Sequence, residues 1–154
     1  MEDQTTWQKQ DYILDLTGNI SSQPYIDMTI RMMCQCGIDV SRNERVIKVN
    51  SAKYNCDLIK IEPDWSAAAF WYEMIALSDN SKVLLKNLNI DSLQADSLAA
   101  KMFENFGVET ISVKEGVVIE KLTFNSQLST FNFKNCPDLF PAVIATCAGL
   151  RLNS

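Results

Sequence analysis

The sequence predicts an α+β fold in which one unit of strand, buried helix, strand, amphipathic helix and hairpin recurs along the chain. Two observations carry this prediction. The first is a helix from about Trp65 to Leu77 whose residues, apart from Ser66 and Glu73, are all apolar. The second is that a helix ending in glycine and followed by a hairpin pattern occurs both before and after this stretch. We expect the apolar helix to lie in the core, covered on every side.

Length and charge limit the classes of partner. The 154 residues, 47% of them hydrophobic, are enough for a packed globular core. A net charge of -5, a pI near 4.7 and the lack of a Lys or Arg run argue against nucleic acid as a partner. The polar start lacks an apolar signal-peptide core, and the apolar helix is shorter than the roughly 20 residues of a bilayer span. We therefore expect a cytoplasmic protein without a membrane partner.

Cysteine and histidine usage argues against a metal site. The five cysteines are odd in number, none forms a Cys-x-x-Cys motif, and histidine is absent. This pattern suggests neither a disulfide framework nor zinc, so we expect reduced thiols and no metal. Acid or base catalysis would have to come from carboxylates, Lys, Tyr or Cys in a tuned environment.

Residues 12–50 predict a strand, a helix and a hairpin. The strand is Tyr12 to Leu16, where apolar and polar residues alternate. Pro24 suits the first helical position, and Gly37 suits the left-handed residue after the helix. Ile38 to Val40 and Arg45 to Val49 are the expected hairpin strands. The apolar stripe of the helix is predicted to comprise Tyr25, Met28, Met32, Met33 and Cys36.

Residues 56–122 predict a complete unit. Leu58 to Ile61 is the expected first strand, and Asp64 is expected to cap the apolar helix that follows. Lys82 to Leu88 is the next strand, and a helix near Leu93 to Phe106 ends at a glycine. The final hairpin is expected to consist of Val108 to Val113 and Val117 to Leu122.

The end of the chain predicts the start of another unit. Phe131 and Phe133 alternate as in a strand, and Cys136-Pro137-Asp138 opens an apolar helix through Ala148, closed by Gly149. Two pairs of segments support the repeat: Met32 to Ile38 resembles Met102 to Val108, and Pro63-Asp64 resembles Pro137-Asp138. Both spacings are about 70 residues. The partial units at each end suggest a fragment whose exposed repeat faces favour self-association.

Three motifs in order resemble the EPSP synthases, the enolpyruvyl transferase family of 3-phosphoshikimate 1-carboxyvinyltransferase. Ser22-Gln23-Pro24-Tyr25-Ile26-Asp27-Met28-Thr29 matches the family's Ser-x-Pro-Tyr-x-Asp-x-Thr motif after a strand. Pro63-Asp64-Trp65-Ser66-Ala67-Ala68 is similar to its Gly-Asp-x-Ser-Ser-Ala helix opening, with Pro63 and Ala67 as departures. Pro137-Asp138 is similar to its Pro-Asp helix opening. The resemblance extends from about Tyr12 to the end of the chain.

This resemblance implies repeated βαβαββ units of the EPSP synthase-like fold, shared between two lobes. Residues 1–11 would be a polar N-terminal segment. Residues 12–122 would be part of one lobe, with a half unit at 12–50 and a complete unit at 56–122. Residues 123–154 would be the crossover strand and first helix of the other lobe. The parent enzyme would transfer the enolpyruvyl group of phosphoenolpyruvate to shikimate-3-phosphate in aromatic amino-acid biosynthesis, without a metal or organic cofactor.

Three residues are candidates for the site. Ser22 precedes a helix, so it either caps the backbone amides or binds shikimate-3-phosphate, as the resemblance implies. Tyr25 is either a core aromatic or lies against the shikimate ring. Asp138 is either a helix cap or the catalytic carboxylate that takes the proton of the attacking hydroxyl. Asp64 is expected to be a cap only, and Asp27 to suit the helix dipole in the first turn.

The family's phosphate-binding Lys and Arg motifs are missing from this chain. It has neither the N-terminal Lys-Ser motif, nor the central Arg motif, nor the Lys-Glu-x-Asp-Arg stretch. Arg31, Arg42 and Arg45 have no matching role. We therefore expect an internal fragment that is inactive alone. The alternatives are a relative of UDP-N-acetylglucosamine enolpyruvyl transferase, which shares the fold and donor, and a non-catalytic βαβαββ binding module.

Overall fold

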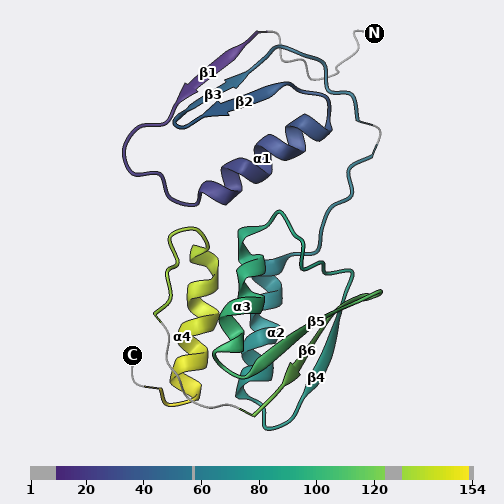
Figure 1. Cartoon of the computed structure of the whole chain (residues 1–154), viewed down its shortest axis with the longest axis vertical. Coiled ribbons are helices and arrows are strands. Elements are labelled where there is room, and N and C mark those ends of the chain that lie inside the picture. The colour runs from purple at the N-terminus through teal and green to yellow at the C-terminus, as the bar shows by residue number, and fades with distance from the viewer. Residues whose placement is uncertain (1–9, 57, 124–129, 153–154) are drawn as a thin grey trace, which may run out of the picture. The chain divides into compact units, whose positions relative to one another are not determined.

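Two three-stranded antiparallel sheets, each in its own compact unit, carry the fold. The computed structural model describes residues 10–56, 58–123 and 130–152. Contacts divide the chain into a first unit, Met1–Lys60, and a second unit, Ile61–Ser154. The described residues contain four α-helices, one in the first unit and three in the second (Figure 1). The mixed class predicted from the sequence is confirmed.

The first unit consists of a sheet with one helix on its face. Its elements are β1 (Tyr12–Asp15), α1 (Gln23–Gln35), β2 (Val40–Asn43) and β3 (Val46–Val49). Strand β3 lies in the middle and pairs with both neighbours, so the order is β1-β3-β2. Alternation in β3 turns Ile47 and Val49 into the core. Helix α1 lies across one face of this sheet (Figure 1).

The face of α1 that packs on this core shares Met33 with the predicted stripe but otherwise differs from it. Ile26, Ile30 and Met33, at helical spacing, pack against the core cluster of the first unit. Met32, by contrast, is 38% exposed. The helix carries apolar residues on two faces, and sequence spacing alone does not say which face meets the sheet. Gly37 does end the helix as predicted, with a left-handed φ of 82°.

The second unit has three helices beside its sheet. Its elements are α2 (Trp65–Leu77), β4 (Lys82–Lys86), η1 (Ala95–Leu98), α3 (Ala99–Glu104), β5 (Val108–Val113), β6 (Gly116–Lys121), η2 (Pro137–Leu139) and α4 (Phe140–Gly149), where η marks a 3-10 helix. Helices α2 and α3 pack on the sheet, and α4 packs against α2 (Figure 1). The strand order is β4-β6-β5. In both sheets the second strand of the hairpin is therefore the central strand.

Buried aromatic side chains form the core of the second unit. Trp65, Tyr72, Phe103 and Phe106 are all fully buried. Their ring centroids follow one another at 6.2, 5.5 and 5.4 Å, within the range of favourable aromatic pairs. Helix α2 is thus the core helix that the sequence predicts. It is not covered on every side, however. Its exposed large side chains are Phe70, Trp71, Met74 and Leu77.

Two predicted strands are absent from the described residues. Leu58 to Ile61 forms no strand, and Leu58 and Ile61 are 87% and 85% exposed. No strand in the described part of the chain pairs with this segment, and a strand pattern without a partner edge gains no ladder hydrogen bonds. Phe131 and Phe133 join the aromatic core instead, with Phe131 lying 5.6 Å from Phe106 between centroids.

Helix α4 departs from prediction at its end. Gly149 belongs to the helix, and Leu150 takes the C-cap position. A Cβ on Gly149 would come within 2.4 Å of Leu77 Cδ2, so this glycine allows close packing of α4 on α2.

Helix α4 shares a compact unit with α2, whereas the sequence assigns residues 123–154 to the other lobe. That lobe assignment stays a prediction. Residues 1–9 of the polar N-terminal segment and 124–129 of the crossover lie outside the described residues.

Candidate functional site

Ser22 precedes α1 in an unusual backbone conformation. Its φ and ψ of 54° and 37° lie in the left-handed region, which costs a non-glycine residue on the order of 1 kcal/mol or more. Its carbonyl accepts a hydrogen bond from the Tyr25 backbone at 3.1 Å, but its side chain makes no capping bond. The interpretation of Ser22 as a side-chain cap is therefore wrong. Its hydroxyl is not used by its own helix.

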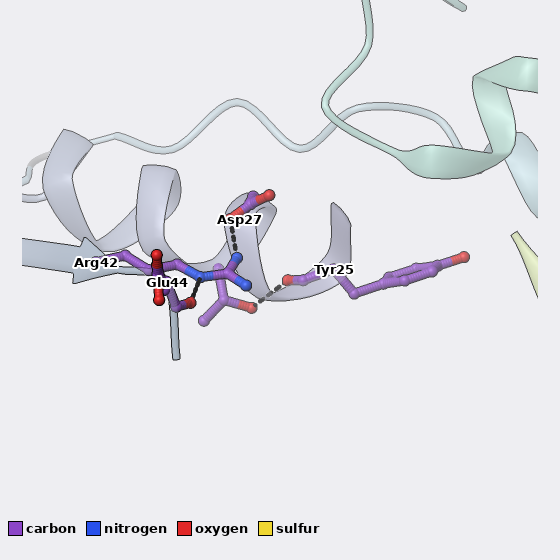
Figure 2. Close-up of polar contacts among 5 residues, drawn as sticks. Tyr25, Asp27, Arg42 and Glu44 are labelled. Carbon is purple, nitrogen blue, oxygen red and sulfur yellow. Dashed lines mark hydrogen bonds and ion pairs between the residues drawn. The ribbon is translucent and has the colours of Figure 1, made fainter. Parts of the chain in front are cut away.

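Tyr25 lies in the first turn of α1 and is half-buried. Its carbonyl accepts a 2.9 Å hydrogen bond from the Thr29 hydroxyl one turn later. Figure 2 shows that the ring extends away from the ion pair formed by Asp27 and Arg42. Ser22 and Tyr25 therefore lie at one helix start, and the tyrosine ring is separate from the nearest charges on its own helix.

An ion pair joins the second turn of α1 to the hairpin. Arg42 Nη1 lies 2.5 Å from Asp27 Oδ1, and Arg42 Nε donates to the Glu44 carbonyl at 3.2 Å (Figure 2). The prediction that Asp27 lies in the first turn is wrong, because that turn contains no acid. The ion pair of Arg42 with Asp27 was not predicted from the motif. Arg45 is also used in the fold, since its Nη1 donates to the carbonyls of Leu16 and Gly18.

The two Pro-Asp helix openings use their carboxylates differently. Asp64 Oδ1 accepts from the backbone amides of Ser66 at 2.8 Å and Ala67 at 3.2 Å, so its prediction as a cap is confirmed. Asp138 lies inside η2, where Cys136 holds the N-cap position. Asp138 is exposed, and within residues 10–56, 58–123 and 130–152 its carboxylate makes no hydrogen bond or ion pair. The interpretation of Asp138 as a cap is therefore wrong.

The three candidates belong to two units. Ser22 and Tyr25 are in the first unit and Asp138 is in the second. At the helix start lie the Ser22 hydroxyl and the half-buried Tyr25 ring, and the backbone amides of a helix N-terminus favour an anion. In the second unit, an exposed carboxylate at the start of a helix is available to accept a proton or a hydrogen bond.

Comparison with known proteins decides the family. The sequence model of EPSP synthase (3-phosphoshikimate 1-carboxyvinyltransferase) matches residues 8–154. This chain belongs to the EPSP synthase family. The resemblance stated from the three motifs is thus confirmed.

Three curated relatives agree with the family assignment, and each is named 3-phosphoshikimate 1-carboxyvinyltransferase. The protein of Bacteroides fragilis (strain NCTC 9343) is 35% identical over 140 residues, 90% of this chain and 34% of its own length. That of Methanocorpusculum labreanum is 32% identical over 91% of this chain and 33% of its own length. That of Clostridium acetobutylicum is 33% identical over 90% and 31%. The chain thus spans about a third of these relatives. The comparisons do not favour either alternative function.

Sequence reasoning missed a polar network beside the second motif of this EPSP synthase family member. The Gln94 amide donates to the Pro63 carbonyl at 2.8 Å and accepts from the Trp65 amide at 2.9 Å. Ser92 donates to Glu62, and the Ser66 hydroxyl donates to the buried carboxylate of Asp96. The available signal was the run of polar residues Ser92, Gln94 and Asp96 just before and at the start of η1.

Burial shifts the pKa of two side chains in the second unit. Burial raises the pKa of Tyr72 to about 12, and its hydroxyl hydrogen-bonds to Thr110 Oγ1 at 3.0 Å. Burial lowers the pKa of Lys121, whose Nζ donates to the carbonyls of Ala76 and Phe106 at 2.6 and 3.0 Å. Lys121 thus satisfies carbonyls at the ends of two helices, a structural role.

Metal-binding clusters and membrane-spanning helices are both absent from the described part of the chain. Within the described ranges, no cluster of three or more His, Cys, Asp or Glu side chains could hold a metal ion. None of the helices that the structure describes is long and apolar enough to cross a membrane.

Proposed function

We propose that the complete protein containing this chain transfers the enolpyruvyl group of phosphoenolpyruvate to shikimate-3-phosphate. The family match and the names of the relatives support this activity. The observation that carries the proposal is the exposed carboxylate of Asp138, which no described residue engages, in the family's Pro-Asp helix opening. The equivalent carboxylate of Asp64 is used by its own helix.

In this proposal Asp138 is the catalytic residue. It hydrogen-bonds to the substrate hydroxyl that attacks phosphoenolpyruvate and takes the proton of that hydroxyl. A positioned base contributes typically 100- to 10,000-fold to a rate, provided that it lies within hydrogen-bond reach of the proton. Because the Asp138 carboxylate has no partner among the described residues, it can bind a substrate without breaking a hydrogen bond or ion pair of the folded chain. No cofactor is needed for this step.

Ser22 and Tyr25 bind shikimate-3-phosphate in the same proposal. The Ser22 hydroxyl is free of a capping role, and the positive end of α1 favours a phosphate or hydroxyl oxygen. The half-buried Tyr25 ring lies three residues later and would pack on the substrate ring. A left-handed serine is a costly conformation that is typical of functional sites, where the surrounding structure maintains it.

The phosphate groups of both substrates need cations that the rest of the protein would supply. In the first unit, Arg42 pairs with a carboxylate and Arg45 donates to backbone carbonyls. In the second unit, Lys121 also donates to backbone carbonyls. Each lost electrostatic contact to a developing charge costs roughly 100- to 1,000-fold in rate. We therefore propose that this chain alone has no turnover.

The finer fold assignment belongs to the same proposal. The two sheets share one strand order and one helix-then-hairpin connection, which supports copies of a repeated βαβαββ unit. In the complete protein these copies would be shared between two lobes. The exposed apolar side chains of α2 would then be covered by further copies, and in isolation they favour self-association. Light scattering at high concentration tests this, because a monodisperse monomer contradicts it.

A chimera tests the proposed activity. The matched third of the Bacteroides fragilis enzyme is replaced by residues 8–154 of this chain, and phosphate release from both substrates is measured beside the parent enzyme. We expect turnover that depends on shikimate-3-phosphate. A folded chimera, with a circular dichroism spectrum and melting curve like those of the parent, that releases no phosphate would contradict the proposal.

A further inference from the structure

Two cysteines from separate segments meet in the first unit. Cys36 is the C-cap residue of α1 and is 3% exposed. Cys56 lies in the segment after β3 and is exposed. The neighbouring Cys56 thiol raises the pKa of the Cys36 thiol. Both are free thiols, as are the other three cysteines.

The backbone holds these two positions side by side. The Asn55 amide donates to the Cys36 carbonyl at 2.8 Å. A Cβ on Gly37 would lie 3.5 Å from Asn55 Cβ, so the chain neighbours of the two cysteines are also in contact. A disulfide requires Cβ atoms about 3.5–4.5 Å apart. The backbone hydrogen bond from Asn55 to Cys36 keeps the two segments adjacent, which is the condition for the two thiols to reach that separation.

We propose that Cys36 and Cys56 are a redox modification site that takes low-molecular-weight disulfides, with Cys56 as the attacking thiol and Cys36 as the resolving thiol. This site lies outside the proposed substrate residues and does not depend on the proposed activity. The exposure of the two thiols sets the order, because only the exposed Cys56 can be reached by a reagent from solvent. The Cys56 thiol and burial raise the pKa of the Cys36 thiol, so little of Cys36 is thiolate before Cys56 has reacted, which agrees with Cys56 attacking first.

The chemistry proceeds by two exchange steps. The Cys56 thiolate attacks one sulfur of the small disulfide, whose S–S bond breaks and releases one small thiolate. Cys36 then loses its proton to solvent and attacks Cys56 Sγ, which releases the second small thiolate. Two protein thiols are oxidised to one disulfide, and one small disulfide is reduced to two thiols. The product joins the end of α1 to the segment that leads to Lys60, the last residue of the first unit.

Tryptic mapping of the whole chain tests the site. The folded protein is treated with glutathione disulfide, alkylated and digested; Cys34 and Cys36 share the peptide 32–42, and Cys56 lies in the peptide 54–60. We expect these peptides to be joined, with the loss of two hydrogen atoms from the intact mass. The exposed Cys34 is the matched control. The link should persist in Cys34→Ser, which then locates it at Cys36.

Other outcomes overturn the proposal. A link lost in Cys34→Ser would assign the reactive partner to Cys34. Glutathione retained on Cys56 while Cys36 stays alkylatable would show that the two thiols do not react. In Cys36→Ser we expect retained glutathione on Cys56, because the resolving thiol is gone. If that variant does not fold, the maps of the unsubstituted chain and of Cys34→Ser still decide the question.

Discussion

The carboxylate of Asp27 lies 2.5 Å from the guanidinium of Arg42, so the second turn of α1 is joined to strand β2 by an ion pair across 15 positions of sequence. The side chains are 50% and 17% exposed, and such a pair contributes no more than about 1 kcal/mol to the free energy of unfolding. The pair also joins the helix that follows Ser22 and contains Tyr25 to the hairpin. We therefore propose that Asp27 and Arg42 position the residues of the proposed site.

Asp27→Asn in the chimera should raise KM for shikimate-3-phosphate several-fold and change kcat less, because helix α1 loses its ion pair with Arg42 of strand β2. Steady-state kinetics with both substrates measures the split. The matched control is Glu120→Gln, which removes the exposed Lys82–Glu120 pair at 2.6 Å in the second unit. An unchanged KM in Asp27→Asn, or an equal change in KM in the control, would contradict the proposal that Asp27 positions the site.

The two Pro-Asp aspartates should differ in their effect on stability. Asp64→Ala removes two capping bonds and should lower the free energy of unfolding by about 0.5–2 kcal/mol. Asp138→Ala removes no internal contact of the described chain and should stay within about 0.5 kcal/mol of the unsubstituted protein. Urea unfolding of the 154-residue chain measures both. Equal losses would show that Asp138 is structural after all.

The ionisation of Tyr72 should lower the free energy of unfolding at alkaline pH. Its folded pKa of about 12 lies above the ordinary value of 10.0, so the folded state keeps its proton when the unfolded state has lost it. This contribution is complete below pH 10, is lost as the pH rises to about 12, and amounts to about 2–3 kcal/mol. Tyr72→Phe should flatten that part of the curve, and a tyrosinate absorbance titration should lose its last step. An unaltered curve would contradict the assignment.

Gly149 should be coupled to Leu77. Gly149→Ala places a methyl group against the end of the exposed leucine side chain, which must rotate to make room, so we expect little net change in the free energy of unfolding despite the better helix propensity of alanine. In a Leu77→Ala background the same substitution should instead stabilise α4, because alanine is the better helix former by up to about 1 kcal/mol. A double-mutant cycle of unfolding free energies measures the coupling. Additive effects would mean that the two helices do not meet at this glycine.

Local patterns predicted most of the elements, and pairing decided the rest. The Asp64 cap, the Gly37 turn and the apolar helix α2 follow from short-range chemistry that a sequence displays. The strand expected at Leu58 to Ile61 depends on a partner edge, which sequence alternation does not supply.

The candidate site was predictable in its residue types but not in their state. The motifs indicated Ser22, Tyr25 and Asp138. Whether a serine or aspartate caps its helix depends on one or two torsion angles. Because position 22 is a serine and not a glycine, the sequence does not indicate the left-handed backbone found there. The ion pair of Asp27 with Arg42 joins distant segments, so no local pattern announces it.

The central claim, that Asp138 is the base, is tested most directly by kcat of the chimera carrying Asp138→Asn beside the chimera carrying Asp64→Asn. Asparagine keeps the shape of either side chain and caps a helix as well as aspartate, so both variants should fold. We expect Asp138→Asn to lower kcat by roughly 100-fold or more and Asp64→Asn to leave it near that of the unsubstituted chimera. Near-normal turnover in Asp138→Asn would contradict the account.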